Sequence, residues 1–206
     1  MWKELLTRAV HILEASRIPE DEWTWGGGTA LAFYFRHRES RDIDVFLTDA
    51  QYLPLLSPRL NRTTQDMAKD YVESSNFLKL KFPGGDVDFI IAPHLTANYF
   101  LLERFREKNI RVETPEEIVL KKLFYRAESL KARDIVDVAV VYERRARHLL
   151  EHASLLGTKL EIVALRWKKI ERIFPQEVAA LRILQPELKD KAAALFANFL
   201  EEIKKY

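Results

Sequence analysis

The stretch "WGGGTALAFYFRHRESRDIDVFL", residues 25–47, runs from three consecutive glycines to two aspartates that are one residue apart. The glycines predict a tight turn, and residues 29–35 predict the start of a helix that packs on a sheet. Residues 41–47 alternate between polar and apolar side chains, which is typical of a strand with one buried face. On such a strand Asp42 and Asp44 would project from the same face.

The two aspartates need a positive partner if both are ionised. Side chains two apart on a strand lie a few ångströms from each other, and like charges at that range repel. A shared divalent cation removes the repulsion, and Mg²⁺ is the natural candidate because it takes carboxylate oxygens together with substrate phosphates. The alternative interpretation of Asp-x-Asp alone is the polar face of an edge strand.

A third acid is expected on a neighbouring strand if the site holds two metal ions. Residues 76–82 and 86–92 flank the turn "PGG" and predict a hairpin. Its second strand offers Asp86 and Asp88. We choose Asp88, because it lies further inside the strand, whereas Asp86 sits at the turn.

The glycine turn adds a second element to the predicted site. A glycine-rich turn that leads into a helix exposes backbone N–H groups, which suit phosphate oxygens, and Thr29 could add a hydroxyl there. The glycines alone could be a tight loop. Together with the Asp-x-Asp strand and the third acid, they are the parts needed to hold a nucleoside triphosphate.

The composition fits one sizeable domain, or two small ones, with a packed core. The chain has 206 residues, 48% of them hydrophobic, and no cysteine, which excludes disulfides and thiolate metal sites. No apolar run approaches the length of a membrane span, and the first residues lack the pattern of a signal peptide. We expect a soluble cytoplasmic protein. A net charge of +2 does not by itself indicate a nucleic-acid binder.

The fold class predicted from these patterns is α+β. Residues 1–112 are expected to form a sheet-containing core with an N-terminal helix over residues 3–16, and residues 113–206 a mostly helical region with breaks near Pro175 and Pro186. The helical region opens with a start signature, in which Thr114 is the N-cap, Pro115 the first helical residue and Glu117 the capping-box acid.

Taken together, these stretches resemble nucleotidyltransferases of the polymerase-β superfamily, and most of all the AbiEii/AbiGii toxin family of type IV toxin–antitoxin and abortive-infection systems. The resemblance rests on four stretches in the family's order: "GGTAL" (27–31), "HRESRDIDVF" (37–46), "VDFI" (87–90) and "EEIVLKKLFYRAESLKARDIVDVA" (116–139). The last of them corresponds to the family's helical motif Lys…Arg-Asp-x-x-Asp.

The resemblance implies Mg²⁺-dependent transfer of a nucleoside monophosphate from an NTP to an acceptor hydroxyl, with release of pyrophosphate. It implies two metal ions, an acceptor such as tRNA or another RNA, and a cognate antitoxin as partner. By position, Gly27, Gly28 and Thr29 would cradle the triphosphate, and Asp42, Asp44 and Asp88 would bind metal as the catalytic acids. Further nucleotide contacts would come from Arg38, Ser40, Lys122, Arg133, Asp134 and Asp137. The family has no counterpart of Gly26, and the third acid is its less regular feature.

Several of these residues also have structural interpretations. Lys122 could belong to a solvated basic helix face, and Lys121 is the alternative phosphate contact. Arg133 and Asp137, four apart, could form an intrahelical ion pair. His37 is better explained by packing or a helix C-cap than by metal binding.

Two other classes of function compete with the transferase. One is a catalytically inactive module of the same fold that binds nucleotide or RNA. The other is a different metal-dependent phosphoryl enzyme, such as a nuclease or a kinase. The basic strip "YERRARH", residues 142–148, could face RNA, although a solvated helix face explains it better.

Overall fold

The computed structural model describes residues 2–68 and 70–206 of the chain. The chain divides into two compact units. Unit 1 comprises Met1–Ala30, Ser40–Pro93 and Phe100–Thr114, and unit 2 comprises Leu31–Glu39, His94–Tyr99 and Pro115–Tyr206. The short segments 31–39 and 94–99 therefore group with the later helices, although both precede residue 113.

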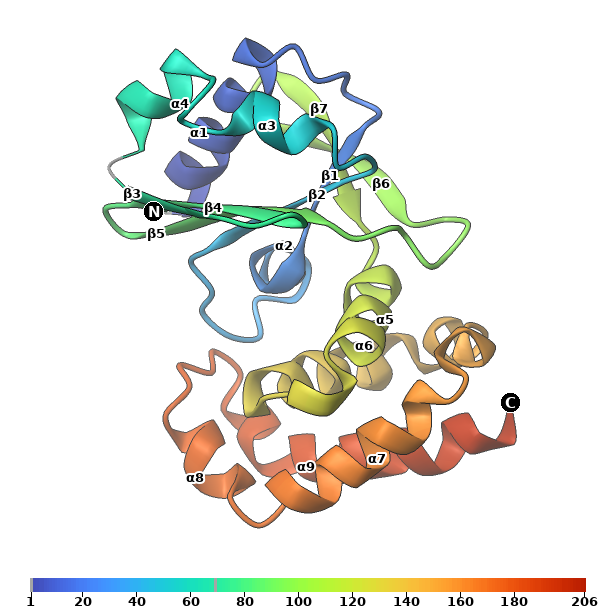
Figure 1. Ribbon diagram of the computed structural model, residues 1–206. Helices are drawn as coiled ribbons and strands as arrows, with labels where there is room; N and C mark the ends of the chain where they lie inside the picture. The colour runs from blue at the N-terminus through green and yellow to red at the C-terminus, as the bar shows by residue number, and fades with distance from the viewer. Residues whose placement is uncertain (1, 69) are drawn as a thin grey trace. The chain divides into compact units, whose positions relative to one another are not determined.

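Unit 1 is built on a mixed sheet, which has seven strands among the described residues, in the order β3-β4-β5-β2-β1-β7-β6 (Figure 1). β2 is parallel to β5 and β1 to β7, and all other neighbours are antiparallel. The strands are β1 (Trp23–Gly26), β2 (Ile43–Leu47), β3 (Asp70–Glu73), β4 (Phe77–Phe82), β5 (Gly85–Ile91), β6 (Phe100–Phe105) and β7 (Lys108–Glu113).

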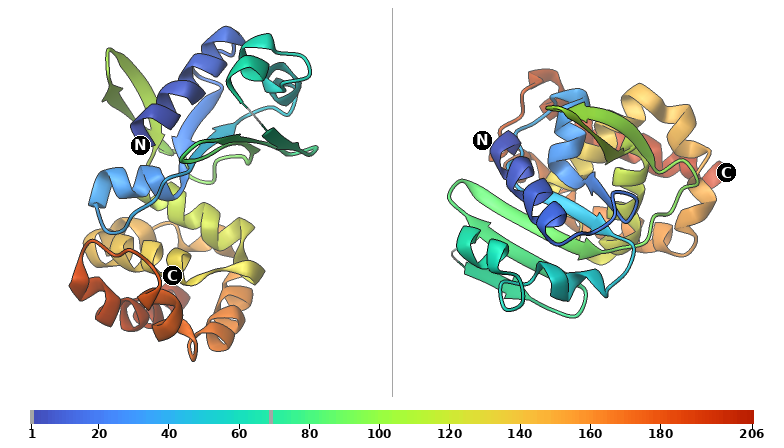
Figure 2. Two further views of the ribbon diagram at one scale, coloured as in Figure 1. Left: turned by 90° about the vertical axis from the view of Figure 1, so that its left-hand side faces the viewer. Right: turned by 90° about the horizontal axis from the view of Figure 1, so that it is seen from above.

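One face of this sheet is apolar and is covered by helices. In β2 the side chains of Ile43, Val45 and Leu47 are buried, as the alternating sequence predicts. The helix α1 (Trp2–Ala15) packs on this face against β2 and β5, and α3 (Tyr52–Leu56) and α4 (Arg62–Met67) lie on the same side (Figures 1 and 2). Burial of these apolar side chains is what fixes the face of each central strand.

Unit 2 is helical. Its helices are α5 (Pro115–Tyr125), α6 (Ala132–Leu150), α7 (Lys159–Ile170), α8 (Phe174–Ala179) and α9 (Pro186–Glu202), with short 3₁₀ turns η1 (Ala127–Ser129), η2 (Ala153–Leu156) and η3 (Ile203–Lys205). The helices α6 and α9 pack along each other (Figures 1 and 2). Trp167 meets Phe174 and Phe196 edge to face, with ring centroids 5.5 and 5.2 Å apart, so aromatic packing fills this core.

Several elements agree with the sequence predictions, and others were missed. The N-terminal helix, β2, the β4/β5 hairpin and the helical second half all form, and Pro115, Pro175 and Pro186 lie at helix starts. The strands β1, β3, β6 and β7 were not predicted. The helix α2 (Gly27–Phe35) begins two residues before Thr29, and β2 begins one residue after Asp42. No helix in residues 2–68 or 70–206 combines the length and apolarity that a membrane crossing requires.

Candidate active site

The two acids Asp44 and Asp88 lie side by side on the central strands of unit 1. β2 and β5 are parallel with Asp44 in register with Asp88. Their neighbours in both strands, Ile43 with Val87 and Val45 with Phe89, are paired and fully buried on the apolar face. Because side chains alternate along a strand, both carboxylates project from the opposite face of the sheet.

This position belongs to a row of polar residues that crosses five strands. Asp88 is paired with Lys79 of β4, and Asp44 with Gly26 of β1. Trp25 is paired with Val112, which puts Glu113 of β7 beside Gly26. We call these five residues the polar row: Lys79, Asp88, Asp44, Gly26 and Glu113.

The glycines bring the start of α2 into contact with the acids. Gly27 has a φ of +71°, and a Cβ atom placed there would lie 1.9 Å from Oδ2 of Asp44. A Cβ atom on Gly26 would lie 2.2 Å from Oε2 of Glu113. A side chain at either position would overlap a carboxylate, so the backbone that enters the helix can approach the acids only as glycine.

Thr29 joins the start of α2 to the segment that leads into β2. Its hydroxyl donates to the carbonyl oxygen of Asp42 and lies 2.9 Å from Oγ of Ser40. The Thr29 side chain is buried. Thr29 and Ser40 therefore hold the residues before Asp44 against the glycine turn, and their predicted phosphate contacts stay predictions.

The third predicted acid, Asp88, has a perturbed environment. Burial raises the pKa of the Asp88 carboxyl to about 6, with Lys79 opposing the rise and Asp44 adding to it. Nζ of Lys79 lies 2.7 Å from Oδ2 of Asp88. Its other oxygen, Oδ1, is buried and has no hydrogen-bond partner among the described residues. Asp88 is thus a carboxylate with one oxygen available to a cation.

Asp42 differs from the other two acids. It precedes β2, is exposed, and its Oδ1 accepts a hydrogen bond of 3.0 Å from the backbone N–H of Asp86, near the start of β5. Within residues 2–68 and 70–206, no three His, Cys, Asp or Glu side chains converge as a ready-made metal site. The pair Asp44 and Asp88 fits Mg²⁺ by its oxygen donors, and the three-acid site with Asp42 stays a prediction.

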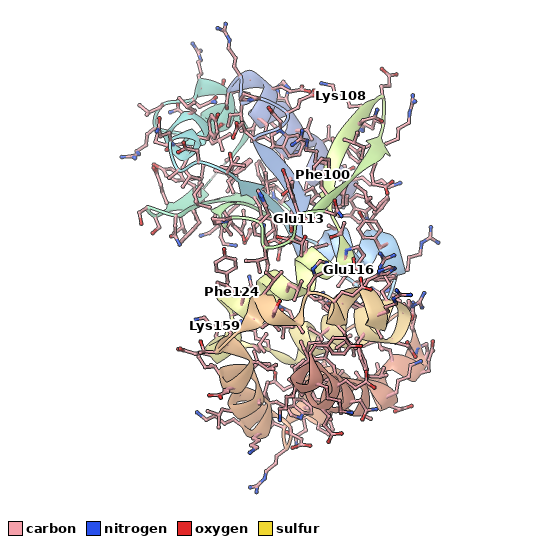
Figure 3. The ribbon with its side chains drawn as sticks, turned by 90° about the vertical axis from the view of Figure 1, so that its right-hand side faces the viewer. Phe100, Lys108, Glu113, Glu116, Phe124 and Lys159 are labelled. Atoms are coloured by element: carbon pink, nitrogen blue, oxygen red, sulfur yellow. The ribbon has the colours of Figure 1, made fainter. Side chains whose placement is uncertain are left out.

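Glu113 was missed by the sequence analysis. It is fully buried at the end of β7 and accepts a hydrogen bond of 3.0 Å from the Thr24 hydroxyl. Figure 3 shows it at the same end of the β6/β7 hairpin as Phe100, with Lys108 at the far end. The sequence around Glu113 does not mark it as a site residue. Its place beside Gly26 follows only from the pairing of β7 with β1.

The predicted helical motif forms a buried ion network inside unit 2. Asp137 on α6 is fully buried and accepts hydrogen bonds from Nε and Nη2 of Arg38, each at 2.7 Å. Nε2 of His37 also lies 2.7 Å from its Oδ1. Lys122 on α5 lies 3.1 Å from Asp137 and 2.9 Å from Asp134. These charges are paired with one another, as buried charges must be.

The network controls the ionisation of both aspartates. Burial alone would raise the pKa of Asp137, but the guanidinium of Arg38, the ammonium of Lys122 and the hydrogen bond from His37 hold that pKa well below its usual range. Burial would also raise the pKa of Asp134, but the ammonium group of Lys122 more than offsets this effect, so the pKa of Asp134 is lowered. Asp134 also accepts from the backbone N–H of Lys131 and so caps the start of α6.

Two structural alternatives raised by the sequence are corrected here. Arg133 is half-buried and has no ion-pair partner among the described residues, so the intrahelical pair with Asp137 does not form. Asp137 turns instead to residues of α5 and of segment 31–39. His37 takes part in this ion network, which goes beyond the packing or capping role that the sequence suggested.

The basic strip of α6 is occupied by contacts within unit 2. Arg144 donates to Gln185, Arg145 to Glu116, and Arg147 to Glu151. Of these three, Arg145 also marks a kink, with non-helical backbone angles inside α6. Most side chains of the strip are exposed, which agrees with the solvated helix face that the sequence favoured.

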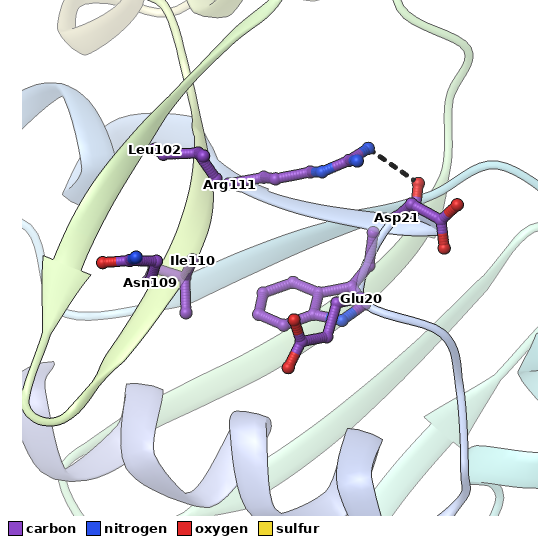
Figure 4. Close-up of a pocket in the computed structure, with 7 residues that line it drawn as sticks. Glu20, Asp21, Leu102, Asn109, Ile110 and Arg111 are labelled. Atoms are coloured by element: carbon purple, nitrogen blue, oxygen red, sulfur yellow. Dashed lines mark hydrogen bonds between the residues drawn. The ribbon is translucent and has the colours of Figure 1, made fainter.

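A pocket of about 310 Å³ lies elsewhere in unit 1 (Figure 4). It is lined by Glu20, Asp21, Trp23, Leu102, Asn109, Ile110 and Arg111, and Arg111 donates to the carbonyl oxygen of Asp21. None of the predicted site residues lines it. The polar row therefore lies outside this pocket.

The site and sheet can now be compared with known proteins. The family model described as "Nucleotidyl transferase AbiEii toxin, Type IV TA system" matches residues 11–205. The chain belongs to the AbiEii toxin family. The polar row and the network around Asp137 are therefore features of an AbiEii nucleotidyltransferase, an enzyme class that transfers nucleotidyl groups.

Solved structures share the fold of this AbiEii protein. JHP933 from Helicobacter pylori matches with a TM-score of 0.56 and 15% identity, over 99% of this chain and 92% of that one. MenT4, a nucleotidyltransferase toxin from Mycobacterium tuberculosis H37Rv, matches with a TM-score of 0.56 and 14% identity, over 98% and 83% of the two chains. The comparison with curated proteins found no match. The α+β nucleotidyltransferase fold predicted from the sequence is confirmed.

Proposed function

We propose that this AbiEii protein is a cytoplasmic toxin that moves a nucleoside monophosphate from an NTP to an acceptor hydroxyl on RNA, with tRNA as the leading candidate, and that a cognate antitoxin opposes it. The observation that carries the proposal is the pairing of Asp44 and Asp88 on one face of the sheet, with the side-chain-free backbone of Gly27 against Asp44.

Asp44 and Asp88 would hold Mg²⁺, with Asp42 as the acid that completes a site for two ions. Bound Mg²⁺ supplies charge stabilisation for the attacking and leaving oxygens. Gly27, Gly28 and Thr29 would present the start of α2 to the phosphates, because the N-terminus of a helix attracts anions. Ser40 supports this turn through Thr29.

In the reaction, the acceptor oxygen forms a bond to the α-phosphorus, and the bond from that phosphorus to the α–β bridging oxygen breaks, so that pyrophosphate leaves. Asp88 would take the proton of the acceptor hydroxyl.

The residues of unit 2 enter the proposal through the family motif. Arg38 and Lys122 are held in fixed positions by Asp137, and Asp134 fixes Lys122 from a second side. Asp134 and Asp137 would therefore act as supports of these cations. Arg133, which lacks an ion-pair partner within the described part of the chain, is the basic side chain of the motif that is available to a nucleotide.

The test is transfer of label from each of the four α-³²P NTPs to total RNA and, separately, to a protein lysate, in the presence of Mg²⁺. We expect labelled RNA and released pyrophosphate with the wild-type protein, and neither with the double variant Asp42→Ala, Asp44→Ala. Release of ADP would indicate a kinase, and RNA cleavage without label would indicate a nuclease. Tight NTP binding without transfer to any acceptor would indicate the inactive module.

A further inference from the structure

The polar row contains a cation of its own. Lys79 on β4 stands opposite Asp88 in the strand register, and its Nζ lies 2.7 Å from Asp88 and 3.3 Å from Asp86. The Lys79 side chain is 31% exposed, and that of Asp88 is 17% exposed. The ion pair is therefore partly withdrawn from water, where charge interactions are stronger than on an open surface.

A second lysine of the same strand shows that this contact is specific. Lys81 is two residues further along β4 and so projects from the same face of the sheet, but its Nζ lies 2.7 Å from the exposed Asp70 of β3. Among the acids that these two ammonium groups contact, only Asp88 is a predicted metal ligand. Of these two lysines, Lys79 is the one that places a positive charge beside Asp88.

We propose that Lys79 is a positioning residue that serves as the internal counter-ion of Asp88, so that its ammonium group opposes the binding of a divalent cation between Asp44 and Asp88. The inference rests on the proposed function of this acid pair. Lys79 fixes Asp88 through Oδ2, and the buried Oδ1 has no hydrogen-bond partner within the described part of the chain.

This arrangement determines how the cation arrives. The ammonium group repels a free cation from Asp88, which lowers the affinity of the pair for Mg²⁺ alone. Nucleotide phosphates bring negative charge and offer the ammonium group another partner. The site therefore favours a cation that arrives together with a nucleotide over a cation that binds alone.

The experiment measures binding of Mn²⁺ in the absence of nucleotide, by electron paramagnetic resonance of the free ion and by calorimetry. Lys79→Met removes the charge at nearly constant length, and Lys79→Arg keeps it. Lys81→Met is the matched control, because it removes the same charge from the same strand. We expect Lys79→Met to bind Mn²⁺ about tenfold more tightly than the wild type. Lys79→Arg and Lys81→Met should bind as the wild type does.

Two further variants separate this inference from the function on which it rests. Asp44→Asn and Asp88→Asn, each also combined with Lys79→Met, report whether the acid pair is the Mn²⁺ site at all. If these variants lose Mn²⁺ but Lys79→Met equals or falls below the wild type, the counter-ion role is overturned and the transferase proposal stands. If neither acid affects Mn²⁺ binding, whether a nucleotide is absent or present, both proposals fail. Lys79→Gln replaces Lys79→Met if the latter lacks a cooperative unfolding transition.

Discussion

Gly27 lacks a side chain at the one place where Asp44 occupies the space that a side chain would need. We predict that Gly27→Ala costs more than the 1–3 kcal/mol expected for a strained backbone alone, because the methyl group also displaces the Asp44 carboxylate. The measurement is the free energy of unfolding in urea, together with Mn²⁺ binding, which should be lost.

The matched control is Gly157→Ala. Gly157 also has a positive φ, +46°, but a Cβ atom there meets nothing within 4 Å. It should show the strain cost of roughly 1–3 kcal/mol and leave Mn²⁺ binding intact. Equal effects of the two substitutions would contradict the close approach of Gly27 to Asp44.

The raised pKa of Asp88 predicts a dependence on pH. Below about pH 6 the folded protein keeps a proton on this carboxyl, whereas the unfolded chain releases it near its ordinary value of 3.8. The metal-free protein should therefore lose stability as the pH rises from 4 through 6. Divalent-cation affinity should rise over the same range, because the cation competes with the proton.

Asp88→Asn provides the check on this pH dependence. In calorimetric titrations at several pH values, the rise in Mn²⁺ affinity around pH 6 should disappear in this variant. A pH profile that is the same in the variant and the wild type would assign the titration to another group.

At the level of single residues, the sequence predicted the acids but not their neighbours. The spacing of Asp42 and Asp44 and the position of Asp88 inside a hairpin strand identified three candidate ligands. Glu113 could not be found in this way, because β7 pairs with β1, a strand distant in sequence. Lys79 lies in the predicted hairpin itself, where the register across the turn places it opposite Asp88. Periodicity gives the face of a strand but not the register of its neighbour.

At the level of elements, Asp137 joins α5, α6 and the segment that carries His37 and Arg38. Removing one partner of a buried ion network leaves the others uncompensated. We predict that Asp137→Asn destabilises the protein by about 3–5 kcal/mol. The measurement is chemical denaturation followed by circular dichroism, which reports mainly on helix.

Glu151→Gln supplies the comparison for Asp137→Asn. Glu151 pairs with Arg147 at the end of the same helix, but both side chains are exposed. Surface pairs of this kind contribute about 0–1 kcal/mol, so little change is expected. Similar losses of stability from both variants would contradict the network's role.

Because Asp137 has a lowered pKa, its contribution to stability is present at neutral pH and is lost as the pH falls toward the acid range.

The predictability of an element depended on how clearly its burial pattern shows in the sequence. The N-terminal helix and β2 show their periods clearly in the sequence, and both formed. β1 has only four residues, all of them buried, so it shows no alternation. β3 and β6 lie at the two edges of the sheet and expose several side chains, which weakens the apolar pattern.

At the level of the whole molecule, the order of the motifs in the sequence was enough to predict the fold. A glycine turn, an Asp-x-Asp strand, a third acid and a helical Arg-Asp-x-x-Asp segment follow one another as in the AbiEii family, and the family model spans residues 11–205. The C-terminal helices after α6 carried no such signature. Their packing depends on apolar contacts such as those of Trp167, which many sequences could make.

Membership of a toxin family predicts an effect on cells. Induced expression of the wild-type protein should arrest growth, and Asp44→Asn should relieve the arrest because it removes one acid of the central pair. Colony counts after induction measure this, with protein levels compared by immunoblot. Arrest that persists at equal levels of the Asp44→Asn variant would show that toxicity does not depend on this site.

The most direct measurement is the rate of pyrophosphate release from NTP with Mg²⁺ and total RNA. Asp44→Asn and Asp88→Asn are compared with Asp49→Asn, which changes an exposed acid just beyond β2. We predict that each of the first two variants lowers the rate by at least about 100-fold. Asp49→Asn should stay within about twofold of the wild type. Release by Asp44→Asn at the wild-type rate would contradict the assignment of catalysis to the acid pair.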